Sequence, residues 1–196
     1  MSAQSRMALV TGATGFFGAH VSRALLAAGW RVAAGCRVDS DRARLRRLTA
    51  AWDGLSEVLL DLGDADEVER MLRQTVPELV VNCAAYGVDH RQQSFEIATA
   101  VNVNAADRLV AAAQAAGVGR FVQVGSGAEY GASGGDPISE RQLLKPQGIY
   151  GVSKAAGTLA VLSRAAMVSL PLVVIRPFGM FGPLEGDHKF VPKVIA

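Results

Sequence analysis

Three glycines follow the first apolar run of the chain, and their spacing limits the possible folds more than any other feature. The run Met7–Thr11 leads directly into Gly12, Gly15 and Gly18, in the pattern G-x-x-G-x-x-G. Glycine permits the tight turn that takes a buried strand into a helix. The helix start then offers unpaired N–H groups and the positive end of a dipole, which suit a pyrophosphate. The pattern predicts a dinucleotide-binding strand, turn and helix.

Apolar runs alternate with longer amphipathic runs along the rest of the chain. Strands are expected at Met7–Thr11, Arg31–Cys36, Glu57–Leu60, Glu78–Cys83, Phe121–Val124 and Leu172–Ile175. Helices are expected near Gly15–Ala28, Asp41–Trp52, Asp64–Gln74, Ile97–Ala116 and Tyr150–Val168. Continuous Val, Ile and Leu runs are typical of parallel strands that are buried on both faces. The alternation therefore predicts an α/β fold, a Rossmann-type doubly wound parallel sheet.

Composition excludes several classes of protein. The 196 residues are half hydrophobic, which suits one domain with a real core and not a disordered chain. Lysine and arginine number 20 and acidic residues 18, so no overall charge attracts nucleic acid or an anionic membrane. No membrane span or targeting segment is recognised, and a cytoplasmic location is expected. Cys36 and Cys83 are too few for a disulfide framework, and no metal site is expected.

The end of the second expected strand bears on the choice between NAD and NADP. An NAD site usually places an acid there to bind the ribose hydroxyls. This strand ends in Gly35, Cys36 and Arg37, and the first acid is Asp39. Arg37 can pair with a 2′-phosphate, so NADP is the expected cofactor and NAD the second choice.

Three later residues form a candidate catalytic group. Tyr150 and Lys154 are four residues apart and share one face of an expected helix. A tyrosine hydroxyl has a pKa of about 10, and a nearby ammonium is expected to lower that pKa. Ser126 closes the fifth expected strand, where its hydroxyl can bind a substrate carbonyl oxygen.

These motifs resemble the extended short-chain dehydrogenase/reductase family, the NAD(P)-dependent epimerase/dehydratase group. The matching segments, in family order, are TGATGFFG (11–18), DL (61–62), NCAA (82–85), VNVNA (101–105), GSGAEYG (125–131), YGVSK (150–154) and RPFGMFGP (176–183). The resemblance implies that Tyr150 is the acid/base, that Ser126 orients the carbonyl, and that Lys154 tunes the tyrosine and binds ribose.

The resemblance also implies a set of cofactor contacts. The glycine-rich loop would hold the dinucleotide, the DL pair the adenine, the two alanines the ribose, and the proline segment the nicotinamide. The expected contacts are Gly12, Thr14, Gly15, Phe16, Phe17, Gly18, Arg37, Asp61, Leu62, Ala84, Ala85, Asn102, Tyr150, Lys154 and Pro177.

Two departures from the family pattern narrow the chemistry. Sugar-nucleotide dehydratases carry an Asp-Glu pair after the catalytic hydroxyl, where this chain has Gly127 and Ala128, so dehydration is not expected. Gly179 replaces an asparagine that many relatives use near the nucleotide-sugar phosphate, which weakens that substrate class. Weaker substrate contacts are expected from Gly127, Glu129, His90 and Lys189, although Glu129 is equally suited to capping a turn.

The preferred function is an NADP-dependent ketoreductase acting on a nucleotide-activated 4-keto-6-deoxysugar. The alternatives are a sugar-nucleotide epimerase, a reductase of a non-sugar carbonyl compound, and a nucleotide-sensing protein without catalysis. Residues 1–183 are expected to form the Rossmann domain, with 184–196 the start of a substrate-binding region that is largely absent from this chain. In the family, Ala-rich helices such as those near 97–116 and 150–168 pair across a dimer axis, so a homodimer is expected.

Overall fold

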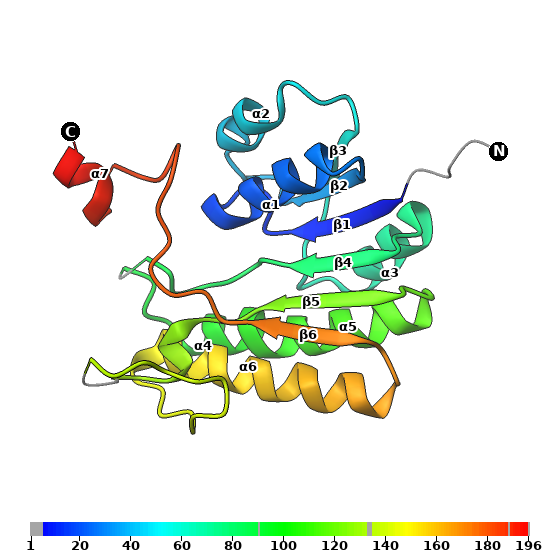
Figure 1. Ribbon diagram of the computed structural model, residues 1–196. Coiled ribbons are helices and arrows are strands. Elements are labelled where there is room, and N and C mark those ends of the chain that lie inside the picture. The colour runs from blue at the N-terminus through cyan, green and yellow to red at the C-terminus, as the bar shows by residue number, and fades with distance from the viewer. Residues whose placement is uncertain (1–5, 90, 133–134, 188, 196) are drawn as a thin grey trace.

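A six-stranded parallel sheet forms the centre of the molecule in the computed structural model, which describes residues 6–89, 91–132, 135–187 and 189–195. The strands lie in the order β3-β2-β1-β4-β5-β6 (Figure 1). Their bounds are β1 Met7–Thr11, β2 Arg31–Cys36, β3 Leu55–Leu59, β4 Leu79–Asn82, β5 Arg120–Val124 and β6 Leu172–Ile175. The order reverses direction beside β1, and in such sheets ligands bind beyond the carboxyl ends of the strands at this point.

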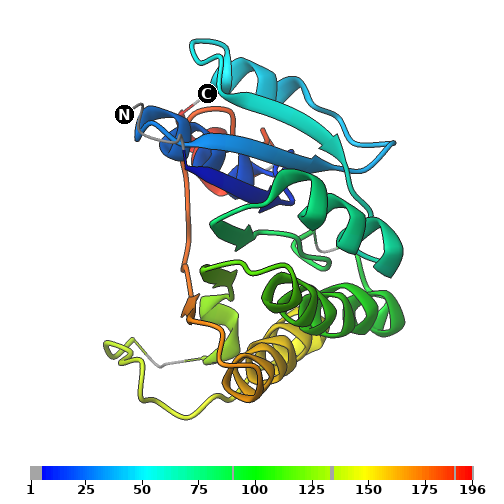
Figure 2. The ribbon, with the colours of Figure 1, turned by 90° about the vertical axis from the view of Figure 1, so that its right-hand side faces the viewer.

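Helices cover the two faces of the sheet, as Figure 2 shows from the side. One layer holds α1 (Phe16–Ala27) and α2 (Ala43–Thr49). The other layer holds α3 Ala65–Thr75, α4 Phe95–Thr99, the π-helical turn η1 Ala100–Ala105, α5 Ala106–Ala115 and α6 Gly148–Met167. A short 3-10 helix, η2 (Gly127–Glu129), follows β5, and α7 (Phe190–Ile195) follows β6. The doubly wound parallel sheet predicted from the sequence is confirmed.

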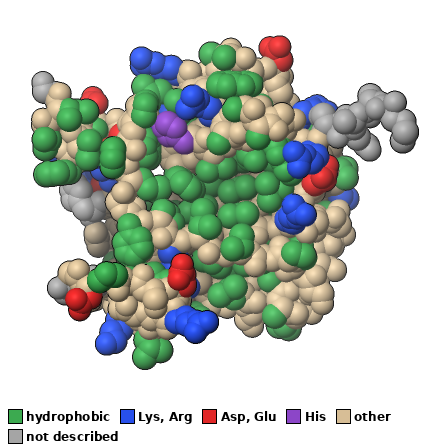
Figure 3. All heavy atoms as spheres, in the orientation of Figure 1, with side chains coloured by type: hydrophobic (Ala, Val, Ile, Leu, Met, Phe, Trp, Pro, Cys, Tyr) green, Lys and Arg blue, Asp and Glu red, His purple; other side chains and the backbone are tan. Residues whose placement is uncertain are grey.

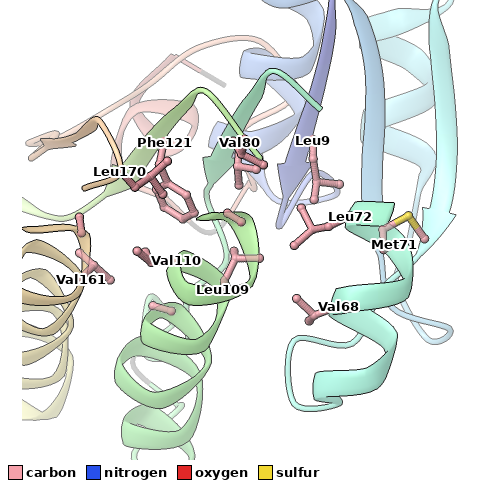
Figure 4. Packing of buried hydrophobic residues seen from close by; sticks show 14 of the residues in the cluster. Leu9, Val68, Met71, Leu72, Val80, Leu109, Val110, Phe121, Val161 and Leu170 are labelled. Carbon is pink, nitrogen blue, oxygen red and sulfur yellow. The ribbon is translucent and has the colours of Figure 1, made fainter. Parts of the chain in front are cut away.

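Two apolar clusters join the helices to the sheet. In the larger one, Leu9 and Val80 from the central strands pack against Leu109 of α5 and Leu72 of α3 (Figure 4). The smaller cluster joins the opposite face of the sheet to α1 and α2, with Leu45 fully buried. These clusters fix the strands in register, so the carboxyl ends of the strands form one stable edge.

The element bounds agree with the sequence-based expectations for β1, β2 and β6 and differ elsewhere. The edge strand β3 begins at Leu55 rather than Glu57. The single helix expected near 97–116 is instead α4, the wider turn η1 and α5 in succession. The helix α7 was not expected.

One part of the sheet is left open on the α1 side. Hydrophobic side chains form a broad patch there in Figure 3. On the edge strand β6, Val173 and Ile175 are exposed. Within the described part of the chain, no helix combines the length and the apolar character that crossing a membrane requires.

Candidate active site

The carboxyl ends of the strands bring the sequence-predicted residues to one edge of the sheet. The glycine turn follows β1, Arg37 follows β2 and Asp61 comes shortly after β3. Ala84, Ser126 and Pro177 follow β4, β5 and β6 in the same way. Because all six strands are parallel, residues that are distant in sequence share this edge.

Close backbone approach forms the glycine turn. Gly12 has a φ of 61°, and a Cβ there would lie 2.7 Å from the Ala84 nitrogen. A Cβ on Gly18 would overlap the Gly12 carbonyl oxygen. Only glycine therefore fits at these two positions, since the obstructing atoms are backbone atoms that cannot move aside.

The start of α1 is left open to an anion. Gly15 provides no side-chain cap, and the first turn contains no acidic residue. The first N–H groups of a helix have no partners within it, so they and the positive dipole end face the turn. Phe16 packs edge-on against His20, with the ring centres 5.0 Å apart, and Phe17 packs on the smaller apolar cluster. Thr14 accepts a hydrogen bond from Arg44 through its carbonyl, at 3.2 Å. These features fit the pyrophosphate of a dinucleotide.

A cavity of about 310 Å³ lies between the ends of β2 and β3. The lining residues are Arg37, Val38, Asp39, Leu59, Leu60, Asp61 and Glu67. The Arg37 guanidinium lies 3.4 Å from the Asp39 carboxylate, and both side chains are largely exposed. Asp61 lines the cavity, whereas Leu62 packs against the larger apolar cluster. The cavity suits the adenosine end of a dinucleotide, and it offers a cation and an acid at its rim.

Asn102 lies in η1 with its side chain fully engaged inside the protein. Its Oδ1 accepts from the Tyr86 N–H at 2.9 Å. Its Nδ2 donates to the Tyr86 carbonyl and to the Ser153 hydroxyl, each at 2.9 Å. These bonds tie the segment that contains Ala84 and Ala85 to α6. These bonds agree with the supporting role that the family resemblance implies for Asn102, and a contact with the cofactor stays a prediction.

Ser126 occupies the first position before η2. Its Oγ accepts from the Ala128 N–H at 3.1 Å, while its own N–H donates to the Glu129 carboxylate at 2.8 Å. The reciprocal pattern is a capping box. Because Oγ is an acceptor in this bond, its proton remains free for another partner.

Tyr150 lies in the first turn of α6, and its hydroxyl is within hydrogen-bonding reach of Ser126. Burial raises the pKa of Tyr150, the Ser126 hydrogen bond lowers it, and the negative charge of Glu129 raises it further. The net direction is upward, so the expected lowering of this pKa by Lys154 is wrong for the free protein. The physical reason is that burial disfavours the phenolate.

Lys154 is buried one helical turn after Tyr150. Its ammonium donates a hydrogen bond to the Val124 carbonyl at 2.6 Å. Burial lowers the pKa of Lys154 to about 8, against raising contributions from Glu129 and Cys83. Burial also raises the pKa of the Cys83 thiol to about 12. A strongly perturbed lysine next to a tyrosine and a serine is typical of a functional site.

Glu129 has no exposed surface, and the sequence left its role open between a substrate contact and the capping of a turn. Its Oε1 accepts from Ser126 N–H and from the Thr158 hydroxyl at 3.0 Å, and its Oε2 accepts from Arg176 Nε at 2.6 Å. The substrate contact considered for Glu129 does not agree with this burial, whereas the alternative of turn capping does. The pattern S-x-x-E was the available signal. Arg176 and Thr158 were not expected, since only the fold brings them to Glu129.

The other expected substrate contacts lie in different surroundings. A Cβ on Gly127 would lie 2.6 Å from the Phe178 ring, and the Gly127 N–H donates to the Pro177 carbonyl at 2.8 Å. Lys189 comes directly before α7, and α7 lies toward the α1 and α2 side of the molecule in Figure 1. His90 lies outside the described residues. The described residues contain no group of three His, Cys, Asp or Glu side chains suited to a metal ion.

Comparison with known proteins finds matches along almost the whole chain. The model of the NAD dependent epimerase/dehydratase family matches residues 8–196. A UDP-glucose 4-epimerase from Mycolicibacterium smegmatis is 31% identical over 92% of this chain and 58% of its own length. A dTDP-4-dehydrorhamnose reductase from Streptomyces griseus is 32% identical over 77% of this chain and 48% of its own length.

A solved structure of a nucleotide-sugar enzyme also matches the fold of this chain. The dTDP-glucose 4,6-dehydratase DesIV from Streptomyces venezuelae, solved with NAD and TYD bound, is 29% identical with a TM-score of 0.86. The match covers 96% of this chain and 61% of DesIV. The chain thus spans about half to three-fifths of the length of these relatives. The family model covers nearly the whole chain, and the chain belongs to the NAD dependent epimerase/dehydratase family.

Proposed function

We propose that the chain carries the cofactor-binding and catalytic part of an NADP-dependent reductase of a nucleotide-activated 4-keto-6-deoxysugar. The observation that carries the proposal is the half-buried Tyr150 beside Ser126, one helical turn before the buried Lys154, at the edge that also holds the glycine turn. The relatives include an epimerase, a dehydratase and a reductase of nucleotide sugars, which supports the substrate class.

Tyr150 is suited to be the proton donor in a reduction, since its raised pKa keeps the phenol neutral at pH 7. A neutral phenol at pH 7 is ready to donate a proton to an oxygen that gains negative charge. The Ser126 hydroxyl, free to donate, binds the same oxygen and orients the carbonyl. Lys154 holds a positive charge beside the pair. The reduced nicotinamide, when bound, supplies the hydride, so one hydride and one proton convert the ketone to an alcohol.

Elimination of water has no support in this site. The two positions after Ser126 are Gly127 and Ala128, and the Phe178 ring fills the space that a side chain on Gly127 would need. The next acid, Glu129, is held by three donors away from solvent. Dehydration needs an acid and a base at the sugar, and the described residues place neither beyond Tyr150.

Epimerisation with NAD is the second candidate, and Asp39 is the observation that favours it. Its carboxylate lines the same cavity as Arg37 and is suited to ribose hydroxyls. NADPH and NADH affinities of Arg37→Ala and Asp39→Ala, measured by nicotinamide fluorescence, separate the two cofactors. NADP use predicts that Arg37→Ala weakens NADPH about tenfold and spares NADH. Arg46→Ala, whose side chain already pairs with Glu57, is the control. A wild-type preference for NADH that Asp39→Ala abolishes would contradict the NADP proposal.

Activity decides between the two reactions. Wild-type protein is mixed with NADPH and a panel of UDP- and dTDP-linked sugars, with and without a 4-keto group. The proposal predicts oxidation of NADPH with a 4-keto sugar nucleotide only. Interconversion of sugar epimers without net use of the cofactor would favour the second candidate. If neither reaction occurs with any sugar of the panel, both candidate functions are rejected for this chain.

A further inference from the structure

A buried carboxylate joins the three segments that carry the candidate catalytic residues. Glu129 accepts hydrogen bonds from Ser126 N–H at 2.8 Å, from the Thr158 hydroxyl at 3.0 Å and from Arg176 Nε at 2.6 Å. Ser126 follows β5, Thr158 lies one helical turn beyond Lys154 on α6, and Arg176 follows β6. One side chain therefore links the serine, the tyrosine–lysine helix and the segment that leads to Pro177.

The surroundings of Glu129 are built to receive its carboxylate. A Cβ on Gly125 would overlap Oε1, so glycine at that position leaves the space that the carboxylate occupies. Arg176 is itself held on a second side, because it donates to the Tyr130 hydroxyl at 3.1 Å and lies 5.2 Å from the centre of that ring. Tyr130 in turn stacks on Phe178, with the ring centres 6.2 Å apart. The charges of Glu129 and Arg176 face each other, and both carboxylate oxygens of Glu129 accept hydrogen bonds.

A buried ion pair of this kind is weak evidence for stability. Removing two charges from water costs free energy that their attraction often does not recover, and apolar pairs of similar size are commonly as stable. The pair therefore calls for a role other than stability. Its contact with the Ser126 N–H, next to the hydroxyl that reaches Tyr150, points to that role.

We propose that Glu129 is a positioning residue: its carboxylate fixes the Ser126 backbone so that the Ser126 hydroxyl stays aligned with Tyr150 for carbonyl reduction. The proposal rests on the proposed function for its chemistry and on the hydrogen bonds for its geometry. Glu129 touches neither substrate nor cofactor in this account. A serine displaced by an ångström would lower the rate of the chemical step about a hundredfold while leaving substrate binding largely intact.

Two double variants test the proposal, because both lose the two charges and only one of them keeps an oxygen at residue 129 for the Ser126 N–H. Glu129→Gln with Arg176→Met removes both charges but keeps an oxygen for the Ser126 N–H. Glu129→Leu with Arg176→Met removes the charges and the oxygen. The first pair is expected to keep kcat within about threefold of wild type, and the second to lose about a hundredfold in kcat with KM within about threefold. Equal kcat values for the two pairs, or a loss confined to KM, would overturn the proposal.

A control and a fallback complete the turnover experiment. Asp107→Asn breaks another ion pair that anchors α6, with Arg164 at 2.8 Å, and is expected to leave kcat unchanged. If the leucine pair fails to fold, Glu129→Asp replaces it, because the carboxylate keeps its charge but is withdrawn by one methylene. A tenfold loss in kcat is then expected, and an unchanged kcat would count against positioning.

Amide exchange provides a readout that needs no substrate. Hydrogen exchange at the Ser126 N–H, followed by NMR on the free chain, is expected to be slow in wild type and in the glutamine pair, and at least about tenfold faster in the leucine pair. Equal exchange in all three would overturn the proposal. A wild-type chain that turns over no nucleotide sugar but shows this exchange pattern would reject the proposed function and leave the positioning of Ser126 in place.

Discussion

The two ends of the candidate site lie along one edge of the sheet but are built from different groups. At the cofactor end, the absence of Cβ atoms at Gly12 and Gly18 lets backbone segments approach each other. At the catalytic end, buried charged side chains hold the segments together through hydrogen bonds, among them Lys154 and Glu129. The cofactor end therefore depends on close backbone packing, which an added side-chain atom would disturb. At the catalytic end, burial disfavours the Lys154 charge, so removing that charge is expected to raise stability and to lower activity.

The largest expected effect of a single change belongs to the catalytic end. Tyr150→Phe removes the proton donor, so turnover should fall about 10²- to 10⁴-fold. Dinucleotide affinity should change less than about threefold, because the backbone turn holds the pyrophosphate. NADPH oxidation and nicotinamide fluorescence measure the two effects. Tyr86→Phe is the control, since the hydroxyl that it removes accepts a long, 3.4 Å hydrogen bond from the Ser94 N–H. Full turnover in Tyr150→Phe would show that another group supplies the proton.

A methyl group added at the cofactor end should instead weaken dinucleotide binding. Gly18→Ala forces a carbon against the Gly12 carbonyl, so it should weaken dinucleotide binding at least about tenfold and lower the free energy of unfolding by about 1–3 kcal/mol. Gly119→Ala is matched, because its Cβ would make an ordinary 3.5 Å contact with the Glu78 carbonyl. Denaturant titration and fluorescence binding provide the measurements. Equal behaviour of the two variants would mean that close approach does not define the turn.

Removing the Lys154 charge should raise stability while it abolishes turnover. The pKa of Lys154 is about 8 in the folded protein and about 10.5 in the unfolded chain, a difference worth about 3 kcal/mol. The unfolded state therefore binds more protons between these values, so the cost of the charge is complete below pH 8 and fades as pH rises to 10.5. Lys154→Met should be the more stable protein at pH 7, with an advantage that shrinks above pH 8.

Denaturant titrations of both proteins from pH 6 to 10.5 follow this difference directly. The exposed Lys145 supplies the control, since Lys145→Met should show no such pH-dependent gain. A Lys154→Met protein that is less stable than wild type at pH 7, by an amount independent of pH, would mean that burial does not disfavour the charged form of Lys154.

The fold could be predicted from sequence where local patterns carried the information. Met7–Thr11 and Leu172–Ile175 were placed correctly because uninterrupted apolar runs are typical of central parallel strands. The turn η1 was missed because it depends on long-range packing. The Asn102 side chain bonds the Tyr86 backbone, and Gly157 of α6 allows contact so close that a Cβ would overlap the Asn102 carbonyl oxygen. Helical periodicity alone contains no sign of such a contact.

The two ends of the site also differed in how well the sequence predicted them. The glycine turn could be read from sequence because its geometry follows from residues within one short segment. The Glu129 network could not, because Thr158 and Arg176 lie 29 and 47 residues away from it. The direction of the Tyr150 pKa was also missed, since it is set by burial and by Glu129 rather than by the spacing to Lys154.

The central claim is that a dinucleotide lies across the glycine turn with its reactive end at Tyr150. A crystal structure of the chain with NADPH tests this most directly. The account predicts the pyrophosphate at the turn from Gly12 to Gly18, the adenosine in the cavity beside Arg37, and the nicotinamide beside Tyr150. NADPH bound instead in the 510 Å³ cavity at the opposite ends of the strands, lined by Trp30 and Arg120, would contradict it.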